Sequence, residues 1–359
     1  MHVVFLLPEY YNKPIGGYRV VFEYANRLAA DGDDVTIIYP NFLFFWKSSI
    51  RRKCKMLFYF AYYMFNQRNI DRFWFCLNKQ VRVKYIWYFR RSYIPKADLY
   101  VATAVDTAFY LNQWDDISSN SKYYFIQALE DWQWGVEFAI ETWKYPLNKI
   151  VVSKWLQELM EKYGQRSQLI ENGIDREGLF YFNPIEIRSP YRVAMLYHKQ
   201  PLKGCDEGLE ALRIVKSNYP ELVVEWFGSF SQPKGLPDWI RYYQTPDVLT
   251  LNRIYNEASI YLAPSRSEGF GLTVGEAMNC GCAIVCTNAG GFLTMARHGQ
   301  TALVVDVMDV EAMARSIIQL IESDRLRCEL ATNGLKNIQQ FTWDLAYRRL
   351  KNTFEQSLI

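Results

Sequence analysis

The chain has 359 residues, half of them hydrophobic, which is enough for two domains with separate cores and excludes a disordered protein. It contains no apolar run of about 18 residues and no basic lead-in at its amino terminus, so we expect neither a membrane span nor a signal peptide. The net charge is only +3, and the seven cysteines form no paired framework, as expected of reduced thiols in a cytoplasmic protein.

The first half of the chain alternates between apolar strand patterns and helical patterns. Residues 3–8 and 35–39 predict buried strands, and residues 18–30 predict a helix with apolar side chains at helical spacing. Gly16 and Gly17 form the turn between the first strand and this helix, where no side chain would block a ligand. Further strands are predicted at 98–104, 123–127 and 149–153, followed by a helix at 154–163.

Residues 41–97 differ from the rest of the chain in charge. They hold 13 Lys or Arg and one acid, Asp71, so the segment carries +12 while the remainder sums to −9, which is +3 minus +12. Aromatic residues are interleaved with these cations at helical spacing, as suits an anionic membrane surface. The alternatives are a helical insertion that packs its aromatics on the sheet, and nucleic-acid binding, for which no recognised motif is present. We favour the membrane or a lipid-linked acceptor over plain packing.

The second half has a similar architecture. Strands are predicted at 192–197, 223–227, 258–264, 282–286 and 302–305, and amphipathic helices at 311–322 and 325–338. Residues 176–190, with two prolines and no clear period, predict a linker. Cys280, Cys282, Cys286 and His298 match no standard zinc spacing, so we interpret them as small buried residues beside a strand.

The stretch from Ser265 to Met278 carries the chemistry of this half. A strand, a glycine loop, a helix and a second strand follow one another here, and this layout places a ligand at the carboxyl end of a parallel sheet. Gly269 and Gly271 allow a sharp turn and a close approach to a ligand. The amides of Phe270, Gly271, Leu272 and Thr273 then form a seat for a phosphate at the start of the helix.

Two glutamates flank this phosphate seat. Glu268 lies in the loop, and Glu276 lies eight residues later in the helix. Two carboxylates beside a phosphate make sense if each accepts hydrogen bonds from hydroxyls of one ligand, one on each side of its phosphates. A nucleotide sugar has this shape, with a ribose, a diphosphate and a hexose.

The stretch resembles the Glu-x7-Glu motif of the retaining glycosyltransferases of family 4, within group 1, which have the GT-B fold. Asn172-Gly173-Ile174-Asp175 and Phe341-Thr342-Trp343 resemble the family's crossings between its two domains. The resemblance implies an α/β protein with two doubly wound Rossmann-like domains that face a cleft. It places the acceptor-binding domain at residues 1–176, with a returning helix at 342–359, and the nucleotide-sugar-binding domain at 177–341.

The resemblance also implies roles for single residues. Lys203 matches the lysine that grips the diphosphate, and His198 stands where the family has an arginine. His198 could donate one hydrogen bond, or Lys199 could supply the missing charge. Glu268, Lys203 and His198 are therefore the catalytic candidates. The donor-binding candidates are Gly16, Gly17, Lys199, Gly228, Gly269, Phe270, Gly271, Leu272, Thr273 and Glu276.

Two regions depart from the family or give no single candidate. Where relatives often carry a His-Asp pair near the acceptor, this chain has Gln127-Ala128-Leu129-Glu130-Asp131-Trp132. Glu130 and Asp131 are acids in a loop at the predicted cleft, and no acceptor role is transferred to them. Residues 238–255 would line the base pocket by resemblance, but the sequence singles out no residue there.

The activity implied is retaining transfer of a hexose from a UDP-, GDP- or dTDP-sugar to a hydroxyl of a glycan or lipid-linked acceptor, in polysaccharide or glycolipid biosynthesis. No Asp-x-Asp pair follows a strand to hold Mg²⁺, so we expect no metal and no cofactor, with cationic side chains at the diphosphate instead. The basic segment would bring the enzyme to the inner face of the plasma membrane. Two alternatives stay open: a phosphorylase or nucleotide-sugar epimerase of the same fold, and a non-catalytic membrane-associated protein that binds nucleotide sugars.

Overall fold

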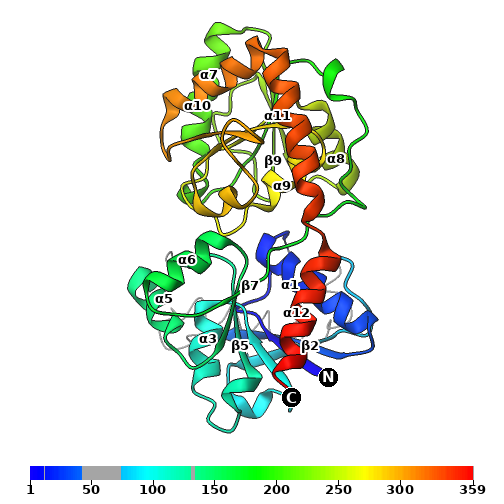
Figure 1. The fold of residues 1–359 in the computed structure, drawn as a ribbon, viewed down its shortest axis with the longest axis vertical. Coiled ribbons are helices and arrows are strands. Elements are labelled where there is room, and N and C mark those ends of the chain that lie inside the picture. Colours follow the sequence, from blue (N-terminus) through cyan, green and yellow to red (C-terminus); the bar gives the residue numbers. More distant parts are fainter. Residues whose placement is uncertain (12, 43–73, 131–133, 359) are drawn as a thin grey trace. The chain divides into compact units, whose positions relative to one another are not determined.

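The computed structural model describes residues 1–11, 13–42, 74–130 and 134–358, which form two compact units (Figure 1). The first unit comprises Met1–Val152, Leu156–Ile170 and Asp344–Ile359, and the second comprises Ser153–Trp155 and Glu171–Trp343. Most of the basic and aromatic segment, residues 43–73, lies outside the described residues, and so does the membrane-binding helix predicted there. Within the described part of the chain, no helix is long and apolar enough to cross a bilayer.

The first unit is built on a parallel sheet of seven strands in the order β3-β2-β1-β4-β5-β6-β7. The strands are β1 (His2–Leu6), β2 (Asp34–Phe42), β3 (Arg82–Tyr88), β4 (Leu99–Ala102), β5 (Lys122–Ile126), β6 (Asn148–Val151) and β7 (Gln168–Leu169). The helices wholly or mainly in this unit are α1 (Gly16–Ala30), α3 (Val105–Asn112), α5 (Val136–Trp143), α6 (Lys154–Lys162) and α12 (Trp343–Gln356). The strand order reverses between β1 and β4, whose carboxyl ends form the switch point where doubly wound sheets bind ligands.

The carboxyl-terminal part of the basic segment is a strand, not a helix. Residues 82–88 form β3, the edge strand, which pairs in parallel with β2. The helical prediction is wrong here because Val, Tyr, Ile and Trp favour a pleated, half-buried surface, and Tyr85 and Ile86 are buried. Earlier in the segment, the ring centroids of Trp74 and Phe75 each lie 5.4 Å from that of Phe22 in α1. These two aromatic side chains therefore pack against the first unit.

The second unit has a parallel sheet of six strands in the order β10-β9-β8-β11-β12-β13. The strands are β8 (Arg192–Leu196), β9 (Val223–Gly228), β10 (Ile240–Gln244), β11 (Ile260–Ala263), β12 (Ala283–Thr287) and β13 (Ala302–Val305). The helices are α7 (Cys205–Asn218), α8 (Val248–Glu257), α9 (Leu272–Asn279), α10 (Val310–Glu322) and α11 (Asp324–Asn337). Two short 3-10 turns of this unit are η5 (Pro201–Lys203) and η6 (Gly290–Thr294). Here the order reverses between β8 and β11.

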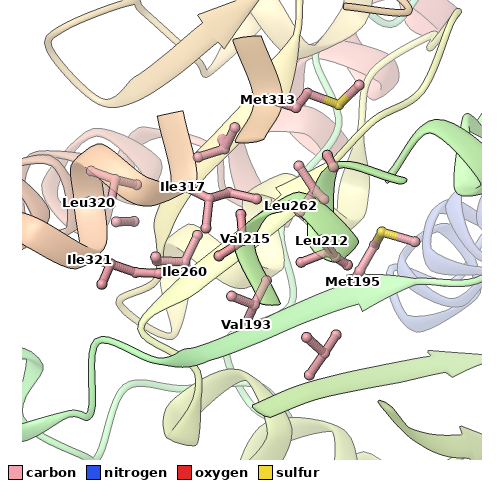
Figure 2. Packing of buried hydrophobic residues seen from close by; sticks show 14 of the residues in the cluster. Val193, Met195, Leu212, Val215, Ile260, Leu262, Met313, Ile317, Leu320 and Ile321 are labelled. Carbon is pink, nitrogen blue, oxygen red and sulfur yellow. The ribbon is translucent and has the colours of Figure 1, made fainter. Parts of the chain in front are cut away.

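The core of the second unit lies between its sheet and helices α7 and α10. Figure 2 shows side chains from β8, β11, α7 and α10 packed together, among them Val193, Met195, Leu212, Val215, Ile260, Leu262, Met313, Ile317, Leu320 and Ile321. Both faces of β11 are buried, which is why its sequence is a continuous apolar run rather than an alternating one. The predicted α/β class with two doubly wound parallel sheets is confirmed.

The segment predicted as a linker, residues 176–190, packs on the second unit instead. Its Arg188 is 4% exposed and donates hydrogen bonds to carbonyls at the ends of α8 and α9. The amides of Phe180 and Phe182 donate to the side-chain oxygens of Asn252 and Asn256 in α8. The two prolines and the lack of hydrophobic periodicity therefore indicated an irregular segment that packs on the second unit, not a flexible linker.

Candidate active site

The predicted residues of the second unit meet where β8 and β11 end, at the reversal of strand order. A small pocket at this point is lined by side chains from η5, β11, the glycine loop and η6, among them Lys203, Tyr261, Ser265, Glu268, Thr273 and Phe292. The pocket therefore contains Lys203, Glu268 and Thr273 from the predicted set. Ligands of doubly wound folds bind at this kind of position.

The glycine loop shapes one wall of the pocket. Gly271 precedes α9 with φ at +90°, and a Cβ there would overlap the ring of Phe292. Gly291 lies so close to the backbone of Gly269 that a Cβ would also overlap, and its amide donates to the Glu268 carbonyl at 2.9 Å. Only glycine fits these positions. The amide of Val274 donates to the Gly271 carbonyl at 3.0 Å, but those of Leu272 and Thr273, the first two of α9, have no acceptor within the helix, and Gly271 has no side chain to cap them. These two amides can therefore bind an anion.

Lys203 and Glu268 form an ion pair in this pocket, with 2.7 Å between Nζ and Oε1. Ser265 donates a hydrogen bond to the same carboxylate oxygen at 2.8 Å. The amide of Arg266 donates to the Leu202 carbonyl at 2.7 Å, which holds the turn that carries Lys203 against the end of β11. The lysine and glutamate side chains are 26% and 14% exposed, so both are largely shielded yet still reach solvent. The pair thus presents a cation and a carboxylate side by side to a ligand.

His198 is a neutral hydrogen-bond donor in this arrangement. Burial and the charge of Lys203 together lower its pKa to about 4, although the carboxylate of Glu268 partly opposes them. The amide of Gln200 donates to Nδ1 at 3.0 Å, so the ring proton is on Nε2. The ring meets Phe230 edge-on at 4.7 Å, and the Lys199 ammonium lies 5.5 Å from the same phenyl ring.

Glu276 lies in α9 and is only 5% exposed. The hydroxyl of Tyr255, from α8, donates to its Oε2 at 3.1 Å. Burial raises the pKa of Tyr255 well above its usual value, so the phenol stays protonated and remains a donor. Gly228 ends β9, where a Cβ would overlap the Tyr197 carbonyl. Sequence reasoning placed Tyr255 in a range of pocket residues but did not single it out.

The predicted residues of the first unit lie at its own switch point. Gly16 and Gly17 begin α1, and the side chain of Gln127 donates to the Gly17 carbonyl at 3.1 Å. Glu130 accepts a hydrogen bond from the Val105 amide at 2.8 Å, and burial together with Asp106 raises its pKa to about 8. Glu130 therefore caps the start of α3. Asp131 lies outside the described residues.

The three cysteines of the group considered for zinc are buried as predicted, but His298 is not: it lies exposed in the turn just before β13. Cys280, Cys282 and Cys286 are fully shielded, and the thiol of Cys282 donates to the Tyr255 carbonyl at 3.1 Å. Over the described ranges, no group of three His, Cys, Asp or Glu side chains could hold a metal ion. His298 instead accepts a hydrogen bond from the Val304 amide at 3.1 Å.

The family described as glycosyl transferases group 1 matches residues 186–337. A mannosyltransferase of Escherichia coli, "O-antigen chain mannosyltransferase B", is 36% identical over 118 residues, which cover 33% of this chain and 30% of the relative. A "D-inositol 3-phosphate glycosyltransferase" of Jonesia denitrificans is 26% identical over 176 residues, which cover 45% of this chain and 42% of the relative. The chain thus matches less than half the length of these curated relatives.

Solved structures match over almost the whole chain. "Sucrose-phosphate synthase (tll1590) from Thermosynechococcus elongatus" has a TM-score of 0.73 at 16% identity and covers 99% of this chain and 98% of its own. Anabaena Alr3699/HepE, in complex with UDP and glucose, also has a TM-score of 0.73 at 16% identity, with 99% and 100% covered. These likenesses identify the fold as GT-B.

Proposed function

We propose that this chain transfers a hexose from a nucleotide diphosphate sugar to a hydroxyl, because residues 186–337 match the group 1 glycosyl transferases and the chain has the GT-B fold. The observation that carries the proposal is the pairing of Lys203 with Glu268 beside the uncapped start of α9. A cation and free amides suit a diphosphate, and a carboxylate suits sugar hydroxyls. Glu276 would accept from the ribose on the other side of the phosphates.

The chemistry that this arrangement favours is stabilisation of the leaving group. As the bond between the anomeric carbon and the phosphate oxygen breaks, negative charge grows on the departing diphosphate. Lys203 would stabilise it with a full charge, and His198 with a neutral Nε2–H donor. The acceptor oxygen bonds to the anomeric carbon on the same face, and its proton passes to the leaving phosphate oxygen. Configuration is thereby retained without a protein nucleophile and without a metal.

The acceptor would be a glycan or a lipid-linked saccharide in polysaccharide or glycolipid biosynthesis. The name of the Escherichia coli relative, a mannosyltransferase of O-antigen chains, supports this class of acceptor. The donor would be a UDP-, GDP- or dTDP-sugar. The solved complex of HepE, which holds UDP and glucose, supports a nucleoside diphosphate with a hexose.

A basic and aromatic surface of the first unit supports work at an anionic membrane. Tyr88 and Tyr93 are 37% and 40% exposed and meet edge to face at 5.5 Å. Lys84 donates to the Tyr93 carbonyl at 2.7 Å, and Arg90 donates to the Tyr88 hydroxyl at 3.3 Å, so both cations border the tyrosines. Neither cation forms an ion pair with a carboxylate of the described residues, and anionic headgroups would supply the missing charges.

This membrane role is tested by vesicle sedimentation. Each cation near an anionic bilayer contributes about 1 kcal/mol, so Lys84→Gln with Arg90→Gln should weaken binding to phosphatidylserine vesicles by about 30-fold. Lys144→Gln with Lys162→Gln removes the same charge elsewhere in the first unit and should have a small effect. Equal losses in the two double variants would show that Lys84 and Arg90 do not form the binding surface, and no vesicle binding by the unchanged protein at low salt would refute the membrane role.

The transferase proposal is tested by ligand binding and then by turnover. UDP, GDP, dTDP and their sugars are compared by thermal shift, and we expect at least one nucleotide to raise the melting temperature. The sugar of that donor should then move to an acceptor hydroxyl. Complete conversion of the donor without any acceptor would indicate an epimerase or phosphorylase. Binding by none of the nucleotides would refute the proposal.

A further inference from the structure

The carboxylate of Glu276 accepts a hydrogen bond from a tyrosine of a neighbouring helix. Glu276 is 5% exposed, and its Oε2 accepts the hydrogen bond from Tyr255, which is fully buried. The ring of Tyr255 is itself fixed by Phe227 at 5.3 Å and Tyr261 at 5.7 Å. A tyrosine packed on two sides cannot turn its hydroxyl away, so the orientation of the carboxylate depends on where α8 lies relative to α9.

Arg188 fixes that relation between the two helices. Its guanidinium donates to the carbonyls of Ala258 at 3.1 Å, Gly281 at 3.1 Å and Cys280 at 2.7 Å. Ala258 and Cys280 are the C-terminal caps of α8 and α9. The last carbonyls of a helix have no partner within it and carry partial negative charge, so one buried cation stabilises both ends at once.

We infer that Tyr255 is a positioning residue for Glu276 and that Arg188 holds the two helix ends from which these side chains project. The inference rests on the proposed function, in which Glu276 accepts hydrogen bonds from the ribose. With Oε2 oriented by a fixed donor, the carboxylate plane is set toward a vicinal pair of hydroxyls. The site would therefore bind a ribonucleoside diphosphate more tightly than its 2′-deoxy form, and Tyr255 would contribute to this preference without touching the ligand.

The test is the ratio of the dissociation constants of dUDP and UDP, measured by calorimetry, with GDP and dGDP if the guanine nucleotide binds better. The unchanged protein should prefer the ribonucleotide, and Tyr255→Phe should lower that preference about fivefold, which corresponds to about 1 kcal/mol. Tyr243→Phe is the matched control, because it also removes a phenol that donates to a buried carboxylate, Glu225, at 2.9 Å. It should leave the preference unchanged.

A second variant separates positioning from general damage. In a Glu276→Ala background, Tyr255→Phe should have no further effect on the ratio, since Tyr255 acts only through the carboxylate. Arg188→Lys, which keeps the charge but lacks the planar set of donors, should lower the preference as well.

Each result has one meaning. If the unchanged protein binds neither nucleotide, the proposed function fails. If it binds both equally, or if Tyr255→Phe keeps the full preference in the presence of Glu276, the positioning inference is overturned while nucleotide binding stands. The inference is equally overturned if Tyr243→Phe lowers the preference as much as Tyr255→Phe does.

Discussion

Replacing Lys203 by methionine should slow sugar transfer more than it weakens nucleotide binding. The Lys203 ammonium lies 2.7 Å from Glu268 in a largely shielded pocket, where the departing diphosphate would be. Two unit charges about 4 Å apart interact by roughly 4 kcal/mol at the effective dielectric of a partly buried site. Loss of one such donor to a developing charge costs about 2.7–4 kcal/mol, or a factor of about 10² to 10³ in kcat.

The assay follows initial rates with the donor that the thermal-shift panel identifies, alongside calorimetric binding of its nucleoside diphosphate. Lys199→Met is the comparison, because Lys199 is the other cation that could act on the diphosphate and its ammonium instead lies over the Phe230 ring. We expect Lys199→Met to stay within about threefold of the unchanged kcat. If Lys203→Met and Lys199→Met slow turnover equally, the cation that acts on the diphosphate is not Lys203, and the reasoning fails.

Three further predictions concern the same site. Because the pKa of His198 lies near 4, the pH profile of kcat should show no inflection from His198 between pH 5 and 8. An inflection near pH 6.5 that disappears in His198→Gln would contradict this. Gly271→Ala should lower the free energy of unfolding by about 1–3 kcal/mol in denaturant melts, and by more than Gly299→Ala, which also has positive φ but open space for a Cβ. EDTA should leave turnover intact, and a loss that Mg²⁺ restores would replace the metal-free mechanism.

The sequence placed Lys203 and Glu268 at the same cleft, although 65 residues separate them, but it did not predict the ion pair between them. Each follows an apolar strand at a glycine-bearing turn, and neighbouring parallel strands bring such turns to the same edge of a sheet. That inference needed only local patterns and the usual strand order. The roles of these residues stay predictions, but their proximity is now a structural fact.

Tyr255 and Arg188 could not be found in the same way. Both side chains act across elements: Tyr255 reaches from α8 to α9, and Arg188 reaches from an irregular segment to two helix ends. Nothing in the neighbouring sequence marks an arginine that will be buried, because its partners are backbone carbonyls, which every residue carries. The edge strand at 82–88 was missed for a different reason, since its exposed cations hid the strand-forming residues between them.

The buried acids of the first unit predict how its stability depends on pH. Burial and Asp106 raise the pKa of Glu130 from 4.5 to about 8, and burial raises that of Asp106 to about 6. An acid with a raised pKa binds its proton more tightly in the folded state, so stability falls as the pH rises between the unfolded and folded values. For Glu130 this window runs from about pH 4.5 to pH 8.

Glu130→Gln removes this penalty and keeps an oxygen that can accept from the Val105 amide. The variant should therefore be more stable than the unchanged protein at pH 8.5, by at least about 1 kcal/mol in denaturant melts, with the gain vanishing toward pH 4.5. Glu137→Gln, an exposed change in the same unit, should give no such pH-dependent gain. An equal gain for Glu130→Gln at pH 5 and pH 8.5 would mean that the carboxyl is ionised throughout. The capping bond would then be one from the Val105 amide to a carboxylate, not to a neutral acid.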